Sequence, residues 1–338
     1  MVRKHRFSSG LLSEARALQD EILVVNGMDG SEVNESLIRN LKKGGVQVNL
    51  TGGLRSGQRP LVSRNSPHLL FVKEFGKDFV HATSVTDIEK ASRDGKPALV
   101  FTWQQVDYIG QDADRLFAHY SMGLRNCGLV YNVGNYAGSG CVDPHQGPLS
   151  NFGLEVVERI EDLGMTLDVG GHTSEATSLD AIHHVSGPVV CTHANPRKLR
   201  DNPRNITDHL IKAIADKGGV IGICAFNYFL VSKGRASIDN YLDHIEYVAE
   251  LVGSDHVGLG LDFILGREIS GIADARRFPP ESYPQRYEEW MIYPEYLTDF
   301  TGVPNIIAGL LERNYLLDDI EKIMGGNWLR VWREVWGK

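Results

Sequence analysis

Short apolar runs recur along the whole chain and alternate with longer amphipathic segments. Eight of these runs are rich in Val, Ile and Leu and apolar on both faces, which is typical of buried parallel strands. They cover 22–26, 46–50, 98–103, 127–131, 165–169, 188–193, 219–224 and 256–262. We therefore expect eight strands, each followed by a segment that crosses back to start the next one.

The segments between the runs have helical periodicity, and several of them end at glycine, the usual residue just past a helix C-terminus. The expected helices cover 32–43, 85–94, 113–122, 152–163, 174–185, 205–217 and 238–252. Strict alternation of strands and helices predicts an α/β fold, a closed (β/α)8 TIM barrel. An open doubly wound sheet is the alternative, but no G-x-G-x-x-G motif follows the first run.

Length and composition agree with one barrel domain. The chain has 338 residues, of which 42% are hydrophobic and 23% charged, as in ordinary globular proteins. We expect a single domain over 1–338, with a rim insertion at about 264–303 and closing C-terminal helices over 304–336.

The charge and the cysteine content limit the kinds of partner that we expect for this protein. The net charge is −8 and no run of Lys or Arg stands out, which argues against nucleic acid as a partner. The N-terminus lacks the apolar core of a signal peptide, and no apolar run is long enough to span a membrane. The four cysteines are scattered without a C-x-x-C pair. These features predict a cytoplasmic protein with reduced cysteines and a small-molecule substrate or ligand.

The ends of the predicted strands carry candidate chemistry, because active sites on these barrels lie at the C-terminal ends of the strands. His172 follows the fifth run, His193 ends the sixth and Asp262 ends the eighth. Either histidine alone would more often be a buried core residue. Two histidines and a carboxylate at one barrel mouth instead indicate a metallohydrolase.

Five segments resemble the membrane (renal) dipeptidase family of the amidohydrolase superfamily, in order and spacing from about Leu23 to the end of the chain. They are GLRNCGLVYN (123–132), LDVGGHTSEAT (167–177), GPVVCTHANPRKLRDNPRNITD (187–208), GSDHVGLGLDF (253–263) and DIEKIMGGNWLRV (319–331). The resemblance implies an amidohydrolase-like barrel that hydrolyses dipeptides and related small amides with two zinc ions.

The resemblance also implies five metal ligands, of which only His172 and His193 are present. Met28 and Gly30 replace a histidine and an aspartate after the first strand, and Gln104 replaces a bridging glutamate. Two close divalent cations are tolerable only when carboxylates offset their charge. We therefore expect no dinuclear centre, and at most one zinc or other divalent metal on the two histidines.

Other residues take roles from the same resemblance. Asp262 corresponds to the residue that handles the proton passing from water to the leaving amine. Arg204 corresponds to the arginine that grips the substrate carboxylate, although a surface arginine is the alternative. Tyr131, Asn132 and Gln104 are further substrate-binding candidates, Tyr131 having rim packing as its alternative. The loop before His172 is one residue longer than the family pattern, which predicts a bulge.

The function that fits these features is hydrolysis of a small amide or dipeptide-like, carboxylate-bearing substrate. Loss of both ligand carboxylates leaves an alternative, a homologue that binds a small carboxylate ligand or runs isomerase or lyase chemistry. A homodimer is also expected, because Trp328, Trp332 and Trp336 share one helical face. The alternative is that this face packs on the chain's own barrel.

Overall fold

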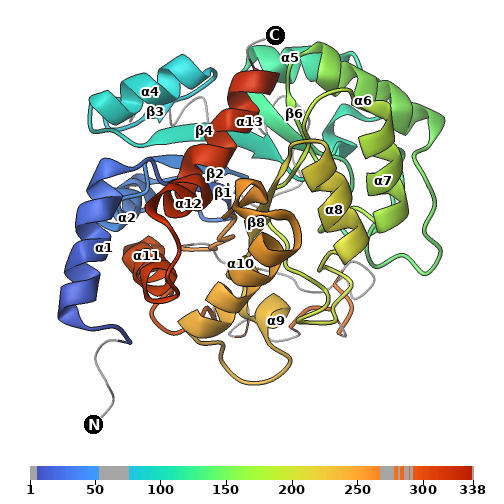
Figure 1. The fold of residues 1–338 in the computed structure, drawn as a ribbon. Coiled ribbons are helices and arrows are strands. Elements are labelled where there is room, and N and C mark those ends of the chain that lie inside the picture. The colour runs from blue at the N-terminus through green and yellow to red at the C-terminus, as the bar shows by residue number, and fades with distance from the viewer. Residues whose placement is uncertain are drawn as a thin grey trace.

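A computed structural model describes residues 6–52, 76–266, 278–280, 282–284, 289 and 292–336. Eight parallel strands close into a barrel, since β1 pairs with both β2 and β9, and β2 pairs with β4 (Figure 1). The barrel strands are β1 (Val25–Asp29), β2 (Val48–Thr51), β4 (Ala98–Trp103), β5 (Leu124–Gly128), β6 (Thr166–Asp168), β7 (Val190–Cys191), β8 (Val220–Ile223) and β9 (Val257–Leu259). The predicted (β/α)8 TIM barrel is confirmed.

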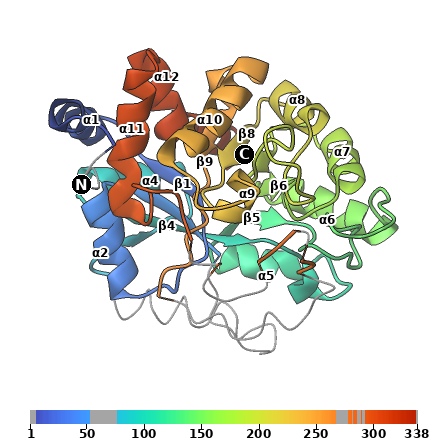
Figure 2. The same cartoon turned by 90° about the horizontal axis from the view of Figure 1, so that it is seen from below.

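Helices surround the strands, as the view in Figure 2 shows. They are α1 (Ser9–Glu21), α2 (Glu35–Gly44), α4 (Val85–Arg93), α5 (Arg115–Ser121), α6 (Asn151–Asp162), α7 (Glu175–His184), α8 (Asp208–Asp216), α9 (Asn227–Leu230), α10 (Ile238–Val252), α11 (Val303–Glu312), α12 (Leu317–Glu321) and α13 (Asn327–Val335). The described ranges also contain short 3₁₀ turns (Asp107–Ile109, Ser254–His256 and Phe300–Gly302) and a π-helical turn (Lys322–Gly326). Ser150, Ser174 and Thr207 cap α6, α7 and α8 with their hydroxyl groups.

Two details differ from the sequence expectation. β5 starts at Leu124, three residues before the predicted run, and ends at Gly128. The strand tolerates Arg125 because its guanidinium donates to the carbonyls of Thr83 and Tyr120. Because β5 ends at Gly128, residues 129–131 of the predicted run lie beyond the strand, at the barrel mouth. An unpredicted short strand, β3 (Val80–His81), pairs with the first residues of β4.

The tryptophan face of the C-terminal helix packs on the chain's own barrel. Trp328 and Trp332 are fully buried, and a Cβ atom on Gly27 or Gly258 would overlap the Trp328 ring. Trp336 donates its indole N–H to the Thr166 hydroxyl at 2.9 Å. The alternative for this face, packing on the chain's own barrel, is confirmed. The homodimer stays a prediction, without this face as its support.

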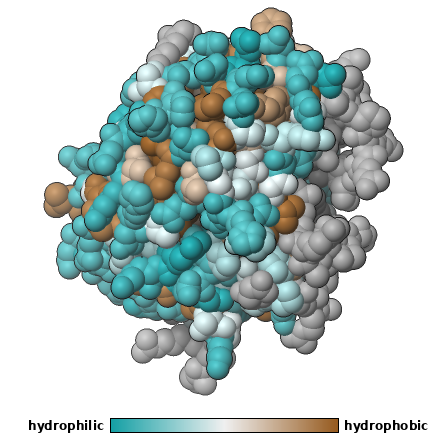
Figure 3. Space-filling view, turned by 90° about the vertical axis from the view of Figure 1, so that its right-hand side faces the viewer, coloured by the Kyte–Doolittle hydropathy of each residue, from teal (hydrophilic) through white to brown (hydrophobic). Residues whose placement is uncertain are grey.

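The outer surface is mixed. The face in Figure 3 shows apolar residues scattered among hydrophilic ones. Among the described residues, the exposed large hydrophobic side chains come from four parts of the chain: Phe117, Tyr136, Leu199, and the neighbours Leu316 and Leu317. Within the described ranges, none of the helices is both long and apolar enough to cross a bilayer. Part of the expected rim insertion, including 267–277, lies outside the described residues.

Candidate active site

Three predicted site residues come together at the C-terminal ends of β4, β6 and β7. Gln104 directly follows β4, His172 follows β6, and His193 lies two residues after β7. They line one hollow of about 210 Å³, which includes space open to solvent. Asp168 and Cys191 line the same hollow. The sequence thus identified the region where the strand ends converge.

The two histidines face each other through their Nε2 atoms, which lie 3.1 Å apart. His172 Nδ1 is 2.6 Å from Asn132 Oδ1, and His193 Nδ1 is 2.7 Å from the Thr192 hydroxyl. An amide oxygen only accepts, so in this arrangement His172 Nδ1 carries a hydrogen and directs the Nε2 lone pair at His193. Burial, assisted by the charge of Arg204, lowers the pKa of His193 well below its usual range. His193 is therefore neutral at pH 7.

The extra residue before His172 forms the expected bulge. Gly170 and Gly171 both have left-handed backbones, with φ of 80° and 59°. Glycine adopts these angles without the steric cost of a side chain. A Cβ atom on Gly171 would also overlap Nη1 of Arg204. The glycine pair thus aims His172 into the hollow and leaves room for the arginine.

Arg204 is buried in the mouth, with 1% of its surface exposed. Its Nη2 donates to the His193 carbonyl at 3.0 Å, and the guanidinium lies over the Phe229 ring at 5.3 Å. Its Nε and Nη1 have no hydrogen-bond partner among the described residues. Buried donors of a permanent cation are normally satisfied, so these two N–H groups indicate the site of an anionic ligand group. The alternative of a surface arginine was wrong.

Asp262 lies three residues beyond β9 in a left-handed conformation, with φ of 52°. Its backbone N–H donates to the Met28 carbonyl at 2.9 Å, which ties it to β1. A Cβ atom on Gly30 would lie 3.6 Å from Asp262 Oδ1. The carboxylate therefore sits on the β1–β9 side of the mouth, whereas the histidines follow β6 and β7.

Two of the residues that replace the family's metal ligands contact each other. Gln104 Nε2 donates to Met28 Sδ at 3.2 Å, and Met28 is fully buried. Asp29 lies between Met28 and Gly30 but its carboxylate accepts from Ser31 and Asn49. Among the described residues, no three His, Cys, Asp or Glu side chains group closely enough to hold a metal.

This donor set does not fit two divalent ions. A thioether and a neutral amide stand where carboxylates would have to offset the charge, and thioethers suit soft ions rather than zinc in an oxygen-rich site. One ion fits better, because two nitrogens bound to tetrahedral zinc at about 2.0–2.1 Å would lie roughly 3.3 Å apart. The Nε2 separation of 3.1 Å is close to that value.

Several residues of the site had no part in the sequence prediction of the active site. Thr192 donates its hydroxyl to Asp168 Oδ2 at 2.6 Å and so joins this carboxyl to His193. Burial raises the pKa of Asp168 to about 7. Tyr283 donates its hydroxyl to Asn132 Oδ1 at 2.7 Å. Asp168 had a signal as a carboxylate within the predicted strand run 165–169, but nothing in the sequence pattern singled out Tyr283.

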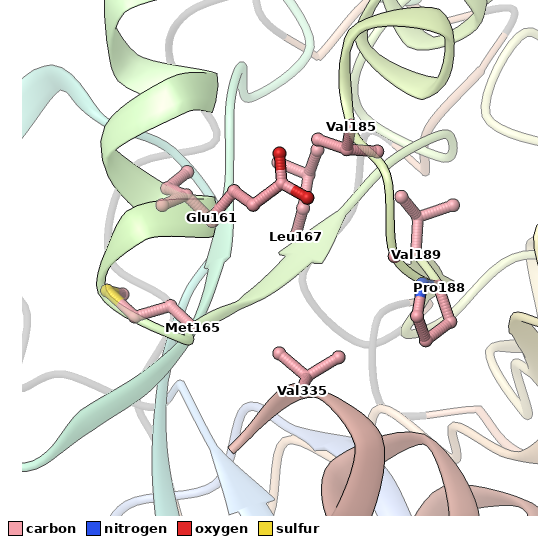
Figure 4. A pocket seen from close by; sticks show the side chains of 9 residues that line it. Glu161, Met165, Leu167, Val185, Pro188, Val189 and Val335 are labelled. Carbon is pink, nitrogen blue, oxygen red and sulfur yellow. The ribbon is translucent and has the colours of Figure 1, made fainter. Parts of the chain in front are cut away.

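A second hollow, of about 330 Å³, lies at the opposite end of the barrel. Figure 4 shows aliphatic side chains around it, including Leu167 and Val335, with the carboxylate of Glu161 directed among them. The Glu161 carboxylate accepts from the Ser186 backbone N–H at 2.9 Å. Apolar walls with one hydrogen-bonded carboxylate offer no catalytic arrangement, so we assign the active site to the mouth.

The buried Asp29 makes stability depend on pH. Burial raises its pKa to about 6, so the native state holds this proton more tightly than the unfolded chain does. Unfolding free energy should therefore fall by about 2 kcal/mol as pH rises from about 4 to about 6. Urea unfolding across this range, compared with Asp29→Asn, would isolate this contribution. A difference between the two proteins that does not change with pH would contradict it.

The family model described as Membrane dipeptidase (Peptidase family M19) matches residues 68–280 and 286–336. The chain belongs to the membrane dipeptidase family. Its fold agrees, since an amidohydrolase from Pseudomonas aeruginosa superimposes with a TM-score of 0.88 at 27% identity, over 96% of this chain and 99% of that chain.

Two sequence relatives illustrate the range of this similarity. A Klebsiella pneumoniae protein, "Uncharacterized protein in pqqA 5'region", is 32% identical over 263 residues, covering 75% of this chain and 88% of its own. Dipeptidase tcpJ of Claviceps purpurea is 28% identical over 260 residues, covering 75% of this chain. This match spans only 55% of the fungal protein.

Proposed function

We propose that this family member hydrolyses small dipeptide-like amides that bear a free carboxylate, using at most one metal ion. The observation that carries the proposal is the buried Arg204, whose Nε and Nη1 have no partner among the described residues. A carboxylate can accept hydrogen bonds from these unpartnered donors and neutralises the charge of the guanidinium. Family membership supplies the reaction class.

The other residues of the barrel mouth would take the remaining catalytic and binding roles beside Arg204. Asp262, a half-buried carboxylate across the mouth, would transfer the proton between water and the leaving amine. His172 and His193 would hold a single ion, zinc being the first candidate, which polarises the amide carbonyl when bound. Tyr131, stacked on His172 at 3.9 Å, would contact the substrate together with Asn132 and Gln104.

A second candidate function is binding without hydrolysis. The Met28–Gln104 contact and Gly30 favour it, because they remove the ligand carboxylates while Arg204 remains. The same arrangement is open to isomerase or lyase chemistry at the mouth, since barrels of this class support many reactions.

Amine release from a panel of dipeptides, measured before and after chelation, tests the proposal. We expect turnover of at least some dipeptides, and none of their carboxamide analogues. Binding of intact dipeptides without turnover would favour the second candidate. Equal rates of hydrolysis for dipeptides and for their carboxamide analogues would contradict the role of Arg204.

Arg204→Lys should lower kcat/KM about 10–100-fold, chiefly by raising KM, because an ammonium cannot reproduce the planar fork of donors. Steady-state kinetics on one dipeptide would measure the effect. Arg197→Lys is the matched control, since Arg197 lies in the same loop but donates to the Pro203 and Asn205 carbonyls. An unchanged KM in Arg204→Lys would contradict the prediction.

A further inference from the structure

Aromatic side chains form a row along the mouth. The Tyr283 ring packs edge-on against Phe229, with centroids 5.6 Å apart, and against Phe278 at 5.2 Å. Phe278 packs edge-on against Tyr131 at 6.1 Å. Phe229 belongs to α9, whereas Phe278 and Tyr283 belong to the segment after β9. Three separate parts of the chain therefore build one continuous row.

The two ends of this row meet the groups that the proposed function uses. At one end the Arg204 guanidinium lies over the Phe229 ring at 5.3 Å. At the other end Tyr131 stacks on His172 at 3.9 Å. Phe229, Tyr283, Phe278 and Tyr131 thus form an apolar boundary that runs from the carboxylate anchor to the histidine pair.

Hydrogen bonds link Tyr283 to the groups at both ends of the aromatic row. Its side chain is 2% exposed, and its hydroxyl donates to Asn132 Oδ1, the atom that also pairs with His172 Nδ1. Beside it, the Ser282 carbonyl accepts from Asn202 Nδ2 at 3.1 Å. The Asn202 side chain also accepts from the Arg204 backbone N–H at 2.9 Å. The tyrosine is therefore positioned relative to the guanidinium through a single asparagine.

We infer that Tyr283 is a specificity-determining residue, whose ring receives the side chain of the residue that bears the substrate carboxylate. The inference rests on the proposed function, in which Arg204 binds that carboxylate. Edges and faces of aromatic rings accept apolar and aromatic groups, whereas a charged side chain would lose its hydration among them. The substrate class is thus dipeptides and N-acyl amino acids with an aromatic or large aliphatic carboxyl-terminal residue.

Calorimetric binding of simple probes tests this without requiring turnover. N-acetyl-L-phenylalanine should bind at least about 10-fold more tightly than N-acetyl-L-alanine, because the phenyl group is buried. N-acetyl-L-aspartate should bind no better than the alanine probe. In Tyr283→Ala the preference for phenylalanine should fall below about threefold, because the ring that receives the side chain is gone.

Matched variants separate the ring from its hydroxyl. Tyr283→Phe keeps the ring and should keep the preference. Tyr241→Phe controls for loss of a buried tyrosine hydroxyl, since Tyr241 is fully buried on α10 and donates to the Ile223 carbonyl at 2.9 Å. Its preference should equal that of the wild type. If Tyr283→Ala does not fold, Phe278→Ala removes the next ring of the row and should reduce the preference likewise.

The outcomes distinguish the role of the aromatic row from the carboxylate-binding role of Arg204. An undiminished preference for phenylalanine in Tyr283→Ala, or in Phe278→Ala if that variant is needed, would overturn the role of the aromatic row. Equal affinity for N-acetyl-L-phenylalanine and its carboxamide would instead overturn the carboxylate role of Arg204. Selective binding of the acid, combined with loss of the phenylalanine preference only in the alanine variants, supports both.

Discussion

Asp262→Asn is expected to lower kcat/KM for dipeptide hydrolysis by about 10²-fold or more, the usual scale for a general acid–base residue. The substitution keeps the side-chain volume and removes the group that can accept and return a proton. The loss should appear mainly in kcat, because Arg204 and the aromatic row remain to bind the substrate. Steady-state kinetics and a thermal melt of the same preparation would measure it.

Asp255→Asn is the matched control for this experiment. Asp255 precedes β9 and pairs with Lys322, so the two aspartates stand at opposite ends of the same strand. The control should retain full activity. If Asp262→Asn unfolds the protein without a specific loss of turnover, Asp262 is a structural barrel residue and the proposed site is misplaced. On the binding alternative, the variant would change ligand affinity and leave the fold intact.

Elemental analysis of the purified protein should find no more than one tightly held divalent ion per chain. The reason is the donor set, since Met28 and Gln104 contact each other and Gly30 offers no side chain at all. Two tightly held zinc ions in the wild type would contradict this reading directly.

Restoring the missing ligands tests the same reasoning in the opposite direction. The triple variant Met28→His, Gly30→Asp and Gln104→Glu should bind a second zinc ion. Gly30→Asp alone is the informative control, because its carboxylate would approach Asp262, whose Oδ1 lies 3.6 Å from the new Cβ position. Without further ligands this like-charge pair should destabilise the fold, and added zinc should not rescue it fully. A triple variant that still holds at most one ion would show that the ligand substitutions do not account for the missing site.

The pattern of the sequence predicted the barrel well because the determinants of a buried parallel strand are local. A run of Val, Ile and Leu is apolar on both faces wherever it stands, and glycine ends a helix through its own backbone freedom. The predicted strand bounds were less accurate where tertiary contacts allow a charged residue inside a buried strand. β5 includes Arg125 because carbonyls from neighbouring segments satisfy its guanidinium.

The sequence also predicts the chemistry of the metal position, and elemental analysis would test this prediction. Residue type alone determines whether a position can offer a carboxylate, so Met28, Gly30 and Gln104 predicted the loss of a dinuclear centre. The loop before His172, one residue longer than the family pattern, likewise predicted a bulge, and Gly170 and Gly171 in this loop have left-handed backbones. Both predictions rest on the resemblance to the membrane dipeptidase family and on the residues that stand at the matching positions.

Tertiary structure decided which distant residues share the mouth. Tyr283 and Asn132 are 151 positions apart, and no periodicity relates them. The tryptophan face could have met a second chain or the barrel, and only the space opened by Gly27 and Gly258 settled which. The burial of Arg204 likewise depends on Gly171 and Phe229. Side-chain packing between segments far apart in the chain sets these contacts, so a local pattern fixes the strands but not their neighbours at the site.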